Sequence, residues 1–173
     1  MRKIVFYGAV SLDGYLADPA DGLEWLFQTD LKGQSTYEAF EVKVDTFVMG
    51  RKTYQETQKH LKNAELYPGK DKIVFSHQVL SDAADTTFVS GDPIKIFHEL
   101  QRTNGGLIWI IGGGSIVKPL LEQEMLDEIW LQIAPVLLGA GKRLFEPGDY
   151  AQRFALLGTQ TMGELTELHL KKK

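Results

Sequence analysis

The sequence contains no cysteine, and this absence excludes several kinds of chemistry. The chain can form no disulfide framework, no thiolate zinc site and no cysteine nucleophile. We therefore expect a cytoplasmic protein. Histidine is scarce as well, and its four positions lack the paired spacing of metal ligands, so we expect no metal site. The four are His60, His77, His98 and His169.

An excess of positive charge is also missing. Lys and Arg number 19 against 23 Asp and Glu, which gives a formal net charge of -4. Such a chain has no basic field for nucleic acid, although a local site for a small phosphate remains open. No stretch approaches the roughly 18 uninterrupted apolar residues of a membrane-spanning helix, so we expect no membrane partner. The apolar start, Met1 to Gly8, is soon interrupted by polar residues and is interpreted as a strand.

The remaining pattern predicts one α/β domain over residues 1–173. The hydrophobic content of 43% suffices for one substantial core. Short β-branched and aromatic runs alternate with segments of helical spacing, which predicts a mostly parallel sheet with helices on both faces. The expected strands are Lys3–Ala9, Thr46–Met49, Lys72–Phe75, Thr87–Val89 and Leu107–Ile111. The expected helices are about Gly33–Lys43, Lys52–Leu61, Pro93–Thr103 and Ser115–Glu124.

The carboxyl-terminal quarter has a different character. Residues Glu128–Leu138 and Phe154–Lys171 are strand-like, and Gly163 is placed to form the turn of a final hairpin. We expect an antiparallel edge to the sheet here. Because exposed apolar edges seek partners, Ile129–Leu138 is a candidate surface for a homodimer.

The clearest local signal is a buried strand, three glycines and a helix start. Gly112, Gly113 and Gly114 precede Ser115 and Ile116. Glycine lets backbone amides approach a phosphate, and a helix start offers unpaired N–H groups. The pattern indicates a phosphate cradle, with a ligand-free strand-to-helix turn as the alternative. A standard dinucleotide fingerprint is excluded because Val117 replaces its third glycine. The run Gly139–Arg143 lacks the P-loop Ser or Thr, so an ATPase is excluded too.

Two further polar groups follow predicted strands. Gly50, Arg51, Lys52 and Thr53 place a glycine, two cations and a hydroxyl at a helix start, which suits a phosphorylated ribose. Ser76-His77 adds a hydroxyl and an imidazole. Taken singly, each of these groups is more simply explained as ordinary surface residues. All three signals, however, lie at the carboxyl ends of parallel strands, the edge where open α/β sheets bind ligands.

Five motifs in register carry a resemblance to a known family. They are Ser11-Leu12-Asp13-Gly14-Tyr15-Leu16-Ala17, Met49-Gly50-Arg51-Lys52-Thr53-Tyr54, Val74-Phe75-Ser76, Gly112-Gly113-Gly114 and Pro135-Val136-Leu137-Leu138-Gly139-x-Gly141. The chain resembles the family that unites dihydrofolate reductase with the carboxyl-terminal reductase domain of the bifunctional riboflavin-biosynthesis deaminase-reductase. The resemblance implies a three-layer α/β/α fold of the dihydrofolate-reductase type.

The resemblance also implies NADPH bound across the sheet. Gly50 to Thr53 and Ser76 to His77 would surround the adenosine phosphates. Gly112 to Ile116 would hold the pyrophosphate and approach the nicotinamide. Ala9, Val10 and Leu16 would face the nicotinamide ring. The activity implied is hydride transfer to a small pterin-like or pyrimidine-like heterocycle, similar to 5-amino-6-(5-phosphoribosylamino)uracil reductase.

The sequence departs from dihydrofolate reductase at one important place. The carboxylate that the family carries on its first helix has no clear counterpart, because anchoring on Phe40 puts Thr36 or Tyr37 there. Dihydrofolate reductase is therefore the alternative activity. A non-catalytic NADPH-binding redox sensor is the alternative from another class. Glu38 and Glu41 would supply an acid only if the register shifted, and helix surfaces carry such pairs routinely.

Four residues are candidates for contact with the substrate. Asp13 is a weak candidate for orienting the substrate or relaying a proton, and an Asp before Gly is more often a turn former. Trp25, Tyr37 and Phe40 are candidates for the wall of a flat heterocycle pocket, with core packing as the equal alternative. No catalytic residue is assigned beyond Asp13, since in hydride transfer the cofactor carries the reactivity.

Overall fold

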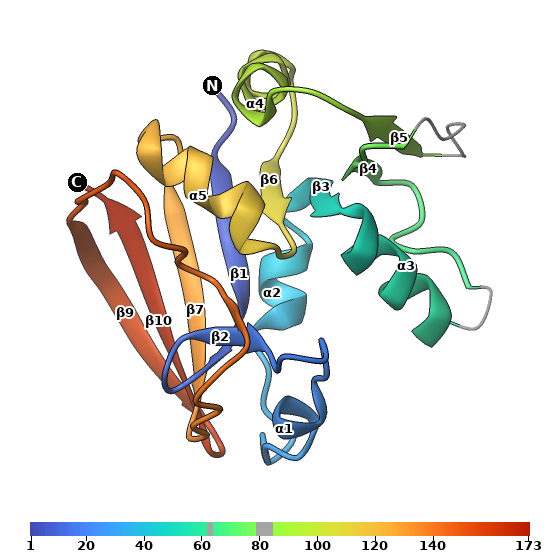
Figure 1. Cartoon of the computed structure of the whole chain (residues 1–173). Helices are drawn as coiled ribbons and strands as arrows, with labels where there is room; N and C mark the ends of the chain where they lie inside the picture. The colour runs from blue at the N-terminus through green and yellow to red at the C-terminus, as the bar shows by residue number, and fades with distance from the viewer. Residues whose placement is uncertain (62–63, 79–84) are drawn as a thin grey trace.

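The computed structural model describes residues 1–61, 64–78 and 85–173, apart from the side chain of His60. Its centre is an eight-stranded sheet in the order β5-β4-β3-β6-β1-β7-β10-β9 (Figure 1). The first six strands of that order are parallel, and β10 pairs in antiparallel fashion with β7 on one side and β9 on the other. The strands are β1 Ile4–Ser11, β3 Val44–Gly50, β4 Asp71–Phe75, β5 Thr86–Val89, β6 Leu107–Ile110, β7 Glu128–Ala134, β9 Phe154–Met162 and β10 Leu165–Lys172. The predicted mixed, mostly parallel sheet is confirmed.

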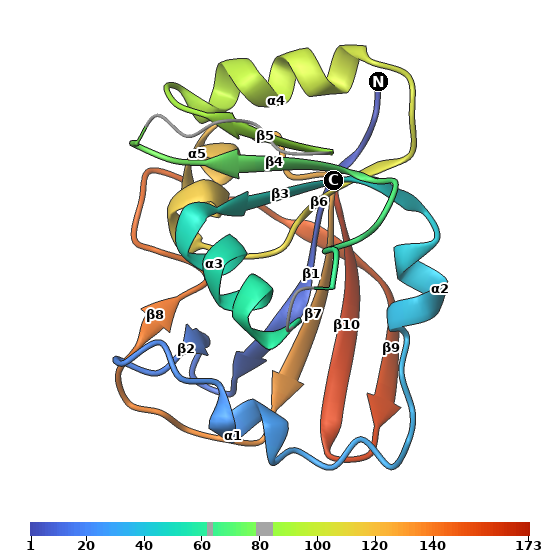
Figure 2. The ribbon, with the colours of Figure 1, turned by 90° about the vertical axis from the view of Figure 1, so that its right-hand side faces the viewer.

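Helices cover both faces of the sheet, as predicted. They are α1 Glu24–Phe27, α2 Tyr37–Glu41, α3 Arg51–His60, α4 Pro93–Arg102 and α5 Gly114–Glu122. Helices α4 and α5 lie on one face, and α2 and α3 lie on the other (Figure 2). A separate two-stranded sheet pairs β2 (Tyr15–Ala17) with β8 (Lys142–Arg143). No helix in the described part of the chain is long and apolar enough to cross a membrane.

Alternation along β1 builds a core on each face. Phe6 is 1% exposed and packs in the cluster beneath α4 and α5, whereas Tyr7 packs in the cluster beneath α2. Successive side chains of a strand point to opposite faces, so a strand covered on both sides is apolar throughout. Phe47 and Trp109 continue the second cluster on β3 and β6.

Two predicted elements are shorter in the structure. The helix expected over Gly33–Lys43 is limited to α2, because Lys32 and Gly33 have φ of 50° and 70° and form a turn. The strand expected over Glu128–Leu138 ends at Ala134, since Pro135 lacks the N–H that would continue the ladder. The predicted hairpin turn is present, with Gly163 at φ 58°.

One expectation about the sheet edge is wrong. The segment Ile129–Leu138 was expected at an exposed antiparallel edge, but β7 lies inside the sheet between β1 and β10. The final hairpin pairs with β7 through β10, and this pairing leaves β9 as the outer strand. Any subunit contact through this side of the sheet would therefore involve β9.

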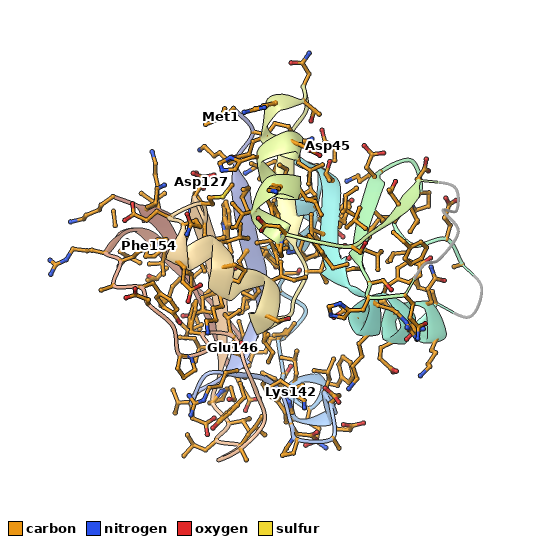
Figure 3. The ribbon with its side chains drawn as sticks, turned by 45° about the horizontal axis from the view of Figure 1, so that its top comes forward. Met1, Asp45, Asp127, Lys142, Glu146 and Phe154 are labelled. Carbon is orange, nitrogen blue, oxygen red and sulfur yellow. The ribbon has the colours of Figure 1, made fainter. Side chains whose placement is uncertain are left out.

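The two ends of the parallel strands differ in position and in content. Figure 3 shows Met1, Asp45 and Asp127 together at one end, with Lys142 and Glu146 towards the other. The first group marks the amino edge, where strands β1, β3 and β7 begin. The predicted phosphate-binding segments all follow strands, so they lie at the opposite, carboxyl edge.

Candidate functional site

The strand register aligns the predicted cofactor residues along the carboxyl edge. Gly50 is level with Phe75, and Val48 is level with Ile110. Phe6 of β1 is also level with Ile110. The glycine loops after β3 and β6, the Ser76 segment and the end of β1 therefore lie side by side. The sheet brings together what the sequence separates by more than 100 residues.

The triple-glycine loop has the shape of a cradle. Gly113 caps α5 with φ 97°, and no side chain caps the helix. The amides of the first turn therefore lack intrahelical acceptors, apart from the turn bonds to the carbonyl of Gly113. Around Gly112 a Cβ would meet no atom within 4 Å, whereas at Gly114 it would lie 2.3 Å from the carbonyl oxygen of Arg143. Gly114 serves packing, and Gly112 faces open space.

The start of α3 forms a second uncapped helix end. Gly50 is the capping residue, with no side-chain hydrogen bond and no atom within 4 Å of its Cβ direction. Arg51 is half-buried, and its guanidinium has no hydrogen-bond or ion-pair partner among the described residues. Lys52 is paired with Asp21 of the loop before α1. Thr53 completes the predicted group in the first turn of the helix.

The Ser76 segment offers fewer unpaired polar groups to a ligand than the two glycine loops do. The Ser76 hydroxyl is engaged in its own turn, where it donates to the carbonyl of Gln78 at 3.0 Å and accepts from the Gln78 amide at 3.1 Å. His77, the second residue after β4, is exposed. The imidazole is thus the accessible polar group of this pair.

The end of β1 places Ala9 and Val10 differently. Ala9 is half-buried on the face of α2, level with Gln132 of β7. Val10 is 4% exposed and packs in the opposite core, with Leu16 against the same cluster. Val10 and Leu16 therefore contribute to this edge of the sheet chiefly through their backbone and their core packing.

Asp13 is held in a turn. Its carboxylate accepts a hydrogen bond from the Ser11 hydroxyl at 2.6 Å and from the amides of Leu138 and Gly139 at 3.1 and 2.7 Å. The Ser11 hydrogen bond, together with those amides, lowers the pKa of Asp13 to about 2. These contacts favour the turn-forming interpretation over a proton donor at neutral pH.

The predicted aromatic wall is divided between two places. Tyr37 and Phe40 pack against Tyr7, with ring centroids 6.2 and 4.4 Å away, and both contact Trp109 edge-on. They belong to the core beneath α2. Trp25 lies on α1, 9% exposed, and its buried indole N–H has no hydrogen-bond partner in the described part of the chain. Of the three, only Trp25 retains an unused polar group.

Neither glutamate of α2 occupies the place of a catalytic acid. Glu41 is paired with Lys70, and Glu38 is exposed. Among the described residues, no group of three or more His, Cys, Asp or Glu side chains is arranged to hold a metal ion.

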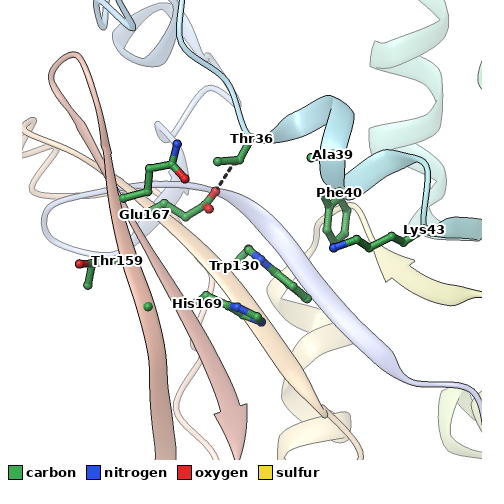
Figure 4. A pocket seen from close by; sticks show the side chains of 10 residues that line it. Thr36, Ala39, Phe40, Lys43, Trp130, Thr159, Glu167 and His169 are labelled. Carbon is green, nitrogen blue, oxygen red and sulfur yellow. Dashed lines mark hydrogen bonds between the residues drawn. The ribbon is translucent and has the colours of Figure 1, made fainter.

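A buried polar network beside α2 was not predicted. The Thr36 hydroxyl donates to Oε2 of Glu167 at 2.7 Å (Figure 4). Nε2 of Gln132 donates to the same oxygen at 2.8 Å and to the Tyr7 hydroxyl at 2.7 Å. Tyr7 and Thr36 are 2.9 Å apart. Because the Thr36 hydroxyl donates its proton to Glu167, the Tyr7 hydroxyl is the donor to Thr36. Burial raises the pKa of Tyr7.

The network connects the first strand to the last. The sequence carried one signal for it, a charged residue between Leu165 and His169 in a strand whose alternate positions face inward. Glu167 is 5% exposed. A carboxylate is thus present near the start of α2, but it comes from β10.

Comparison with known proteins identifies relatives of the whole chain. The family model of the RibD C-terminal domain matches residues 2–168. The chain is 31% identical over 172 residues to the uncharacterized protein YwjB of Bacillus subtilis (strain 168), covering 97% of each.

Solved structures with the same fold span a wider range. A putative riboflavin biosynthesis protein from Shewanella sp. PV-4 has a TM-score of 0.87 at 24% identity, with 99% of each chain covered. The deaminase/5-amino-6-(5-phosphoribosylamino)uracil reductase of Thermotoga maritima has a TM-score of 0.71 at 14% identity, and the match covers 99% of this chain and 57% of that one. Dihydrofolate reductase from Enterococcus faecalis, complexed with NADP(H), has a TM-score of 0.64 at 13% identity, covering 99% and 96%. The predicted dihydrofolate-reductase-like fold is confirmed.

Proposed function

Because this chain belongs to the RibD C-terminal domain family, we propose that it is an NADPH-dependent reductase of a small pterin-like or pyrimidine-like heterocycle. The observation that carries the proposal is the alignment of two uncapped, glycine-initiated helices along one edge of the sheet. Helix starts of this kind bind phosphate, and open α/β sheets bind ligands at this edge. The relative from Thermotoga maritima is a reductase by name, which supports the reaction class.

The residues present fit the cofactor. Space is open at the Cβ positions of Gly50 and Gly112, where a phosphate must approach backbone amides. Gly112 to Ile116 would hold the pyrophosphate with first-turn amides. Arg51, Lys52 and Thr53, with His77 positioned by the Ser76 turn, would hold the ribose phosphate that distinguishes NADPH from NADH. When bound, NADPH supplies the hydride.

The remaining candidates would orient the acceptor. Ala9 would flank the nicotinamide on the face of α2, and Trp25, whose buried indole N–H has no partner among the described residues, would contribute its ring to the acceptor side. Tyr37 and Phe40 would support the acceptor side of the site through their packing on Tyr7. Asp13 would keep the loop at Leu138 and Gly139 in place beside β1. The proton then comes from water.

Formation of a homodimer stays a prediction, and the surface that we propose for it is now β9. This outer strand exposes Leu156 and Leu157, at 60% and 52%. An unpaired apolar edge strand favours pairing with another chain. The cytoplasmic location likewise stays a prediction.

The cofactor assignment is tested by titrating the purified protein with NADPH and NADH under nicotinamide fluorescence. We expect a clear preference for NADPH, and Arg51→Ala should weaken NADPH binding about tenfold while leaving NADH unchanged. Lys59→Ala, on the same helix but far from its start, is the matched control. Failure of both nucleotides to bind would contradict the assignment.

Turnover separates an enzyme from a cofactor-binding sensor. The oxidation of NADPH is followed at its nicotinamide absorbance with pterin and pyrimidine acceptors. Consumption of NADPH that depends on one acceptor class supports the reductase. Tight NADPH binding without turnover by any acceptor would favour the sensor.

A further inference from the structure

A cavity of about 280 Å³ lies between α2 and the strands β7, β10 and β9. Its lining includes none of the residues of the two glycine loops. The volume is close to the lower end of the usual range for ligand pockets, about 300–1,000 Å³. Figure 4 shows Glu167 and Thr36 near one end of the group and Lys43 beyond Phe40 at the other. The cavity is therefore separate from the proposed cofactor groove.

Glu167 gives this cavity its chemical character. The residue is 5% exposed and lines the cavity. Both donors to its carboxylate, Thr36 and Gln132, reach Oε2. Oε1 receives no hydrogen bond, and no Lys, Arg or His forms an ion pair with Glu167, within the described part of the chain. Burying a carboxylate is costly unless it is paired, so this oxygen favours a positively charged donor.

The wall beside Glu167 is flat and aromatic. The rings of Trp130 and His169 stack with centroids 4.0 Å apart and planes at 15°, and Phe40 lies 5.1 Å from Trp130. His169 Nε2 is bonded to Glu128 at 2.9 Å, which fixes the orientation of its ring. An aromatic face attracts cations and stacks with flat rings.

We propose that this cavity binds a flat aromatic ligand bearing an amidinium-type cation. An N–H group of the ligand donates to Oε1 of Glu167, and the ligand ring packs against the stacked pair of Trp130 and His169. Because Oε2 already accepts two hydrogen bonds, the cation makes its charge-assisted hydrogen bond to Oε1. Lys43 lines the cavity and is exposed, so it disfavours a second positive charge on the ligand and accommodates an acidic substituent.

The site is tested with benzamidine as the probe, without NADPH, by ¹H–¹⁵N NMR of the tryptophan indole groups. The chain has three Trp residues, so the spectrum has three indole signals, and Trp130→Phe identifies the relevant one. We expect the Trp130 signal to shift on addition of benzamidine and to stay in place with neutral benzamide. Glu167→Gln should weaken benzamidine binding about tenfold or more. Glu38→Gln, on the exposed surface of α2, is the matched control and should bind normally.

Three results would overturn the proposal: an unmoved Trp130 signal, equal binding of benzamide, or unchanged affinity in Glu167→Gln. If Glu167→Gln does not fold, Gly158→Leu decides instead. Gly158 lines the cavity on β9, and a Cβ there would meet no atom within 4 Å, so a leucine side chain would begin in open space and occupy part of the cavity. Benzamidine binding should be lost in Gly158→Leu and retained in Thr161→Leu on the same strand. Retained binding in Gly158→Leu would contradict the site whatever NADPH titrations show.

Discussion

Two arginines at opposite ends of the parallel strands have opposite surroundings. Arg2, at the amino edge, is 9% exposed and donates to the carbonyl of Gly106 and to Thr103, Thr46 and Asp45. Arg51, at the carboxyl edge, has no polar partner among the described residues. The guanidinium group at the amino edge is occupied by hydrogen bonds, whereas the guanidinium group at the carboxyl edge is open to a ligand.

This difference separates stability from binding. A buried guanidinium with several acceptors holds strand ends and loops together, and it costs stability when removed. A half-buried guanidinium without acceptors contributes little to folding and remains available for an anion. The amino edge is thus expected to determine how stable the protein is, and the carboxyl edge what it binds.

The largest effect is expected at the amino edge. Arg2→Met should lower the free energy of unfolding by about 2–4 kcal/mol, because Thr46 and the Gly106 carbonyl lose their donor. Denaturant unfolding measures this change, and NADPH affinity should stay the same. Arg153→Met, at an exposed position, is the control and should stay within about 0.5 kcal/mol. A loss of NADPH affinity in folded Arg2→Met would contradict the assignment of stability to the amino edge and of binding to the carboxyl edge.

Two alanine substitutions divide the triple-glycine loop in the same way. Gly114→Ala should cost about 1–3 kcal/mol of unfolding free energy, because its Cβ would lie 2.3 Å from the Arg143 carbonyl oxygen. Gly112→Ala meets no atom within 4 Å, so stability should change by less than about 0.5 kcal/mol. Its Cβ would instead occupy the space proposed for a phosphate, and NADPH affinity should fall about tenfold. Unfolding and nucleotide titrations of both variants check this division, and unchanged NADPH affinity in Gly112→Ala would contradict it.

The carboxyl edge was the part most open to prediction from sequence. Glycine after a buried strand has few interpretations, and parallel strands bring successive carboxyl ends to one edge. The loops at Gly50 and Gly112 were therefore predicted together with their alignment. The hairpin turn at Gly163 was readable for the same reason, because positive φ favours glycine.

Contacts between distant segments could not be read in this way. Nothing local in β10 shows that Glu167 meets Thr36, which lies 131 residues earlier. Strand order was equally hidden, because a pattern of alternating residues does not state which neighbours a strand has. This is why β7 was expected at an edge and the small β2–β8 sheet was not expected at all.

A smaller, pH-dependent effect is expected at Asp13. Its folded pKa is about 2, below the value near 3.9 of an unfolded aspartate, so the ionised form stabilises the fold above about pH 4. This contribution is lost as the pH falls from about 4 to 2. Asp13→Asn should therefore unfold at lower denaturant concentration than the wild type at pH 7, and the difference should shrink below pH 4. A difference that persists unchanged at pH 2 would show that the charge is not the cause.

The smallest expected effect sharpens the comparison at the carboxyl edge itself. Lys52 differs from its neighbour Arg51 in being paired, with Asp21 as its partner. Its side chain is 68% exposed, so the pair contributes little to stability. A bound phosphate must compete with Asp21 for this ammonium group and is repelled by the nearby carboxylate. Asp21→Asn should thus raise NADPH affinity about two- to threefold at low salt. Asp85→Asn, at an exposed position just before β5, is the control. Nucleotide titrations at two salt concentrations check this, since the gain should diminish at high salt. A fall in affinity would mean that the Asp21–Lys52 pair orders the phosphate site, and the carboxyl edge would then be pre-arranged by its own contacts, as the amino edge is.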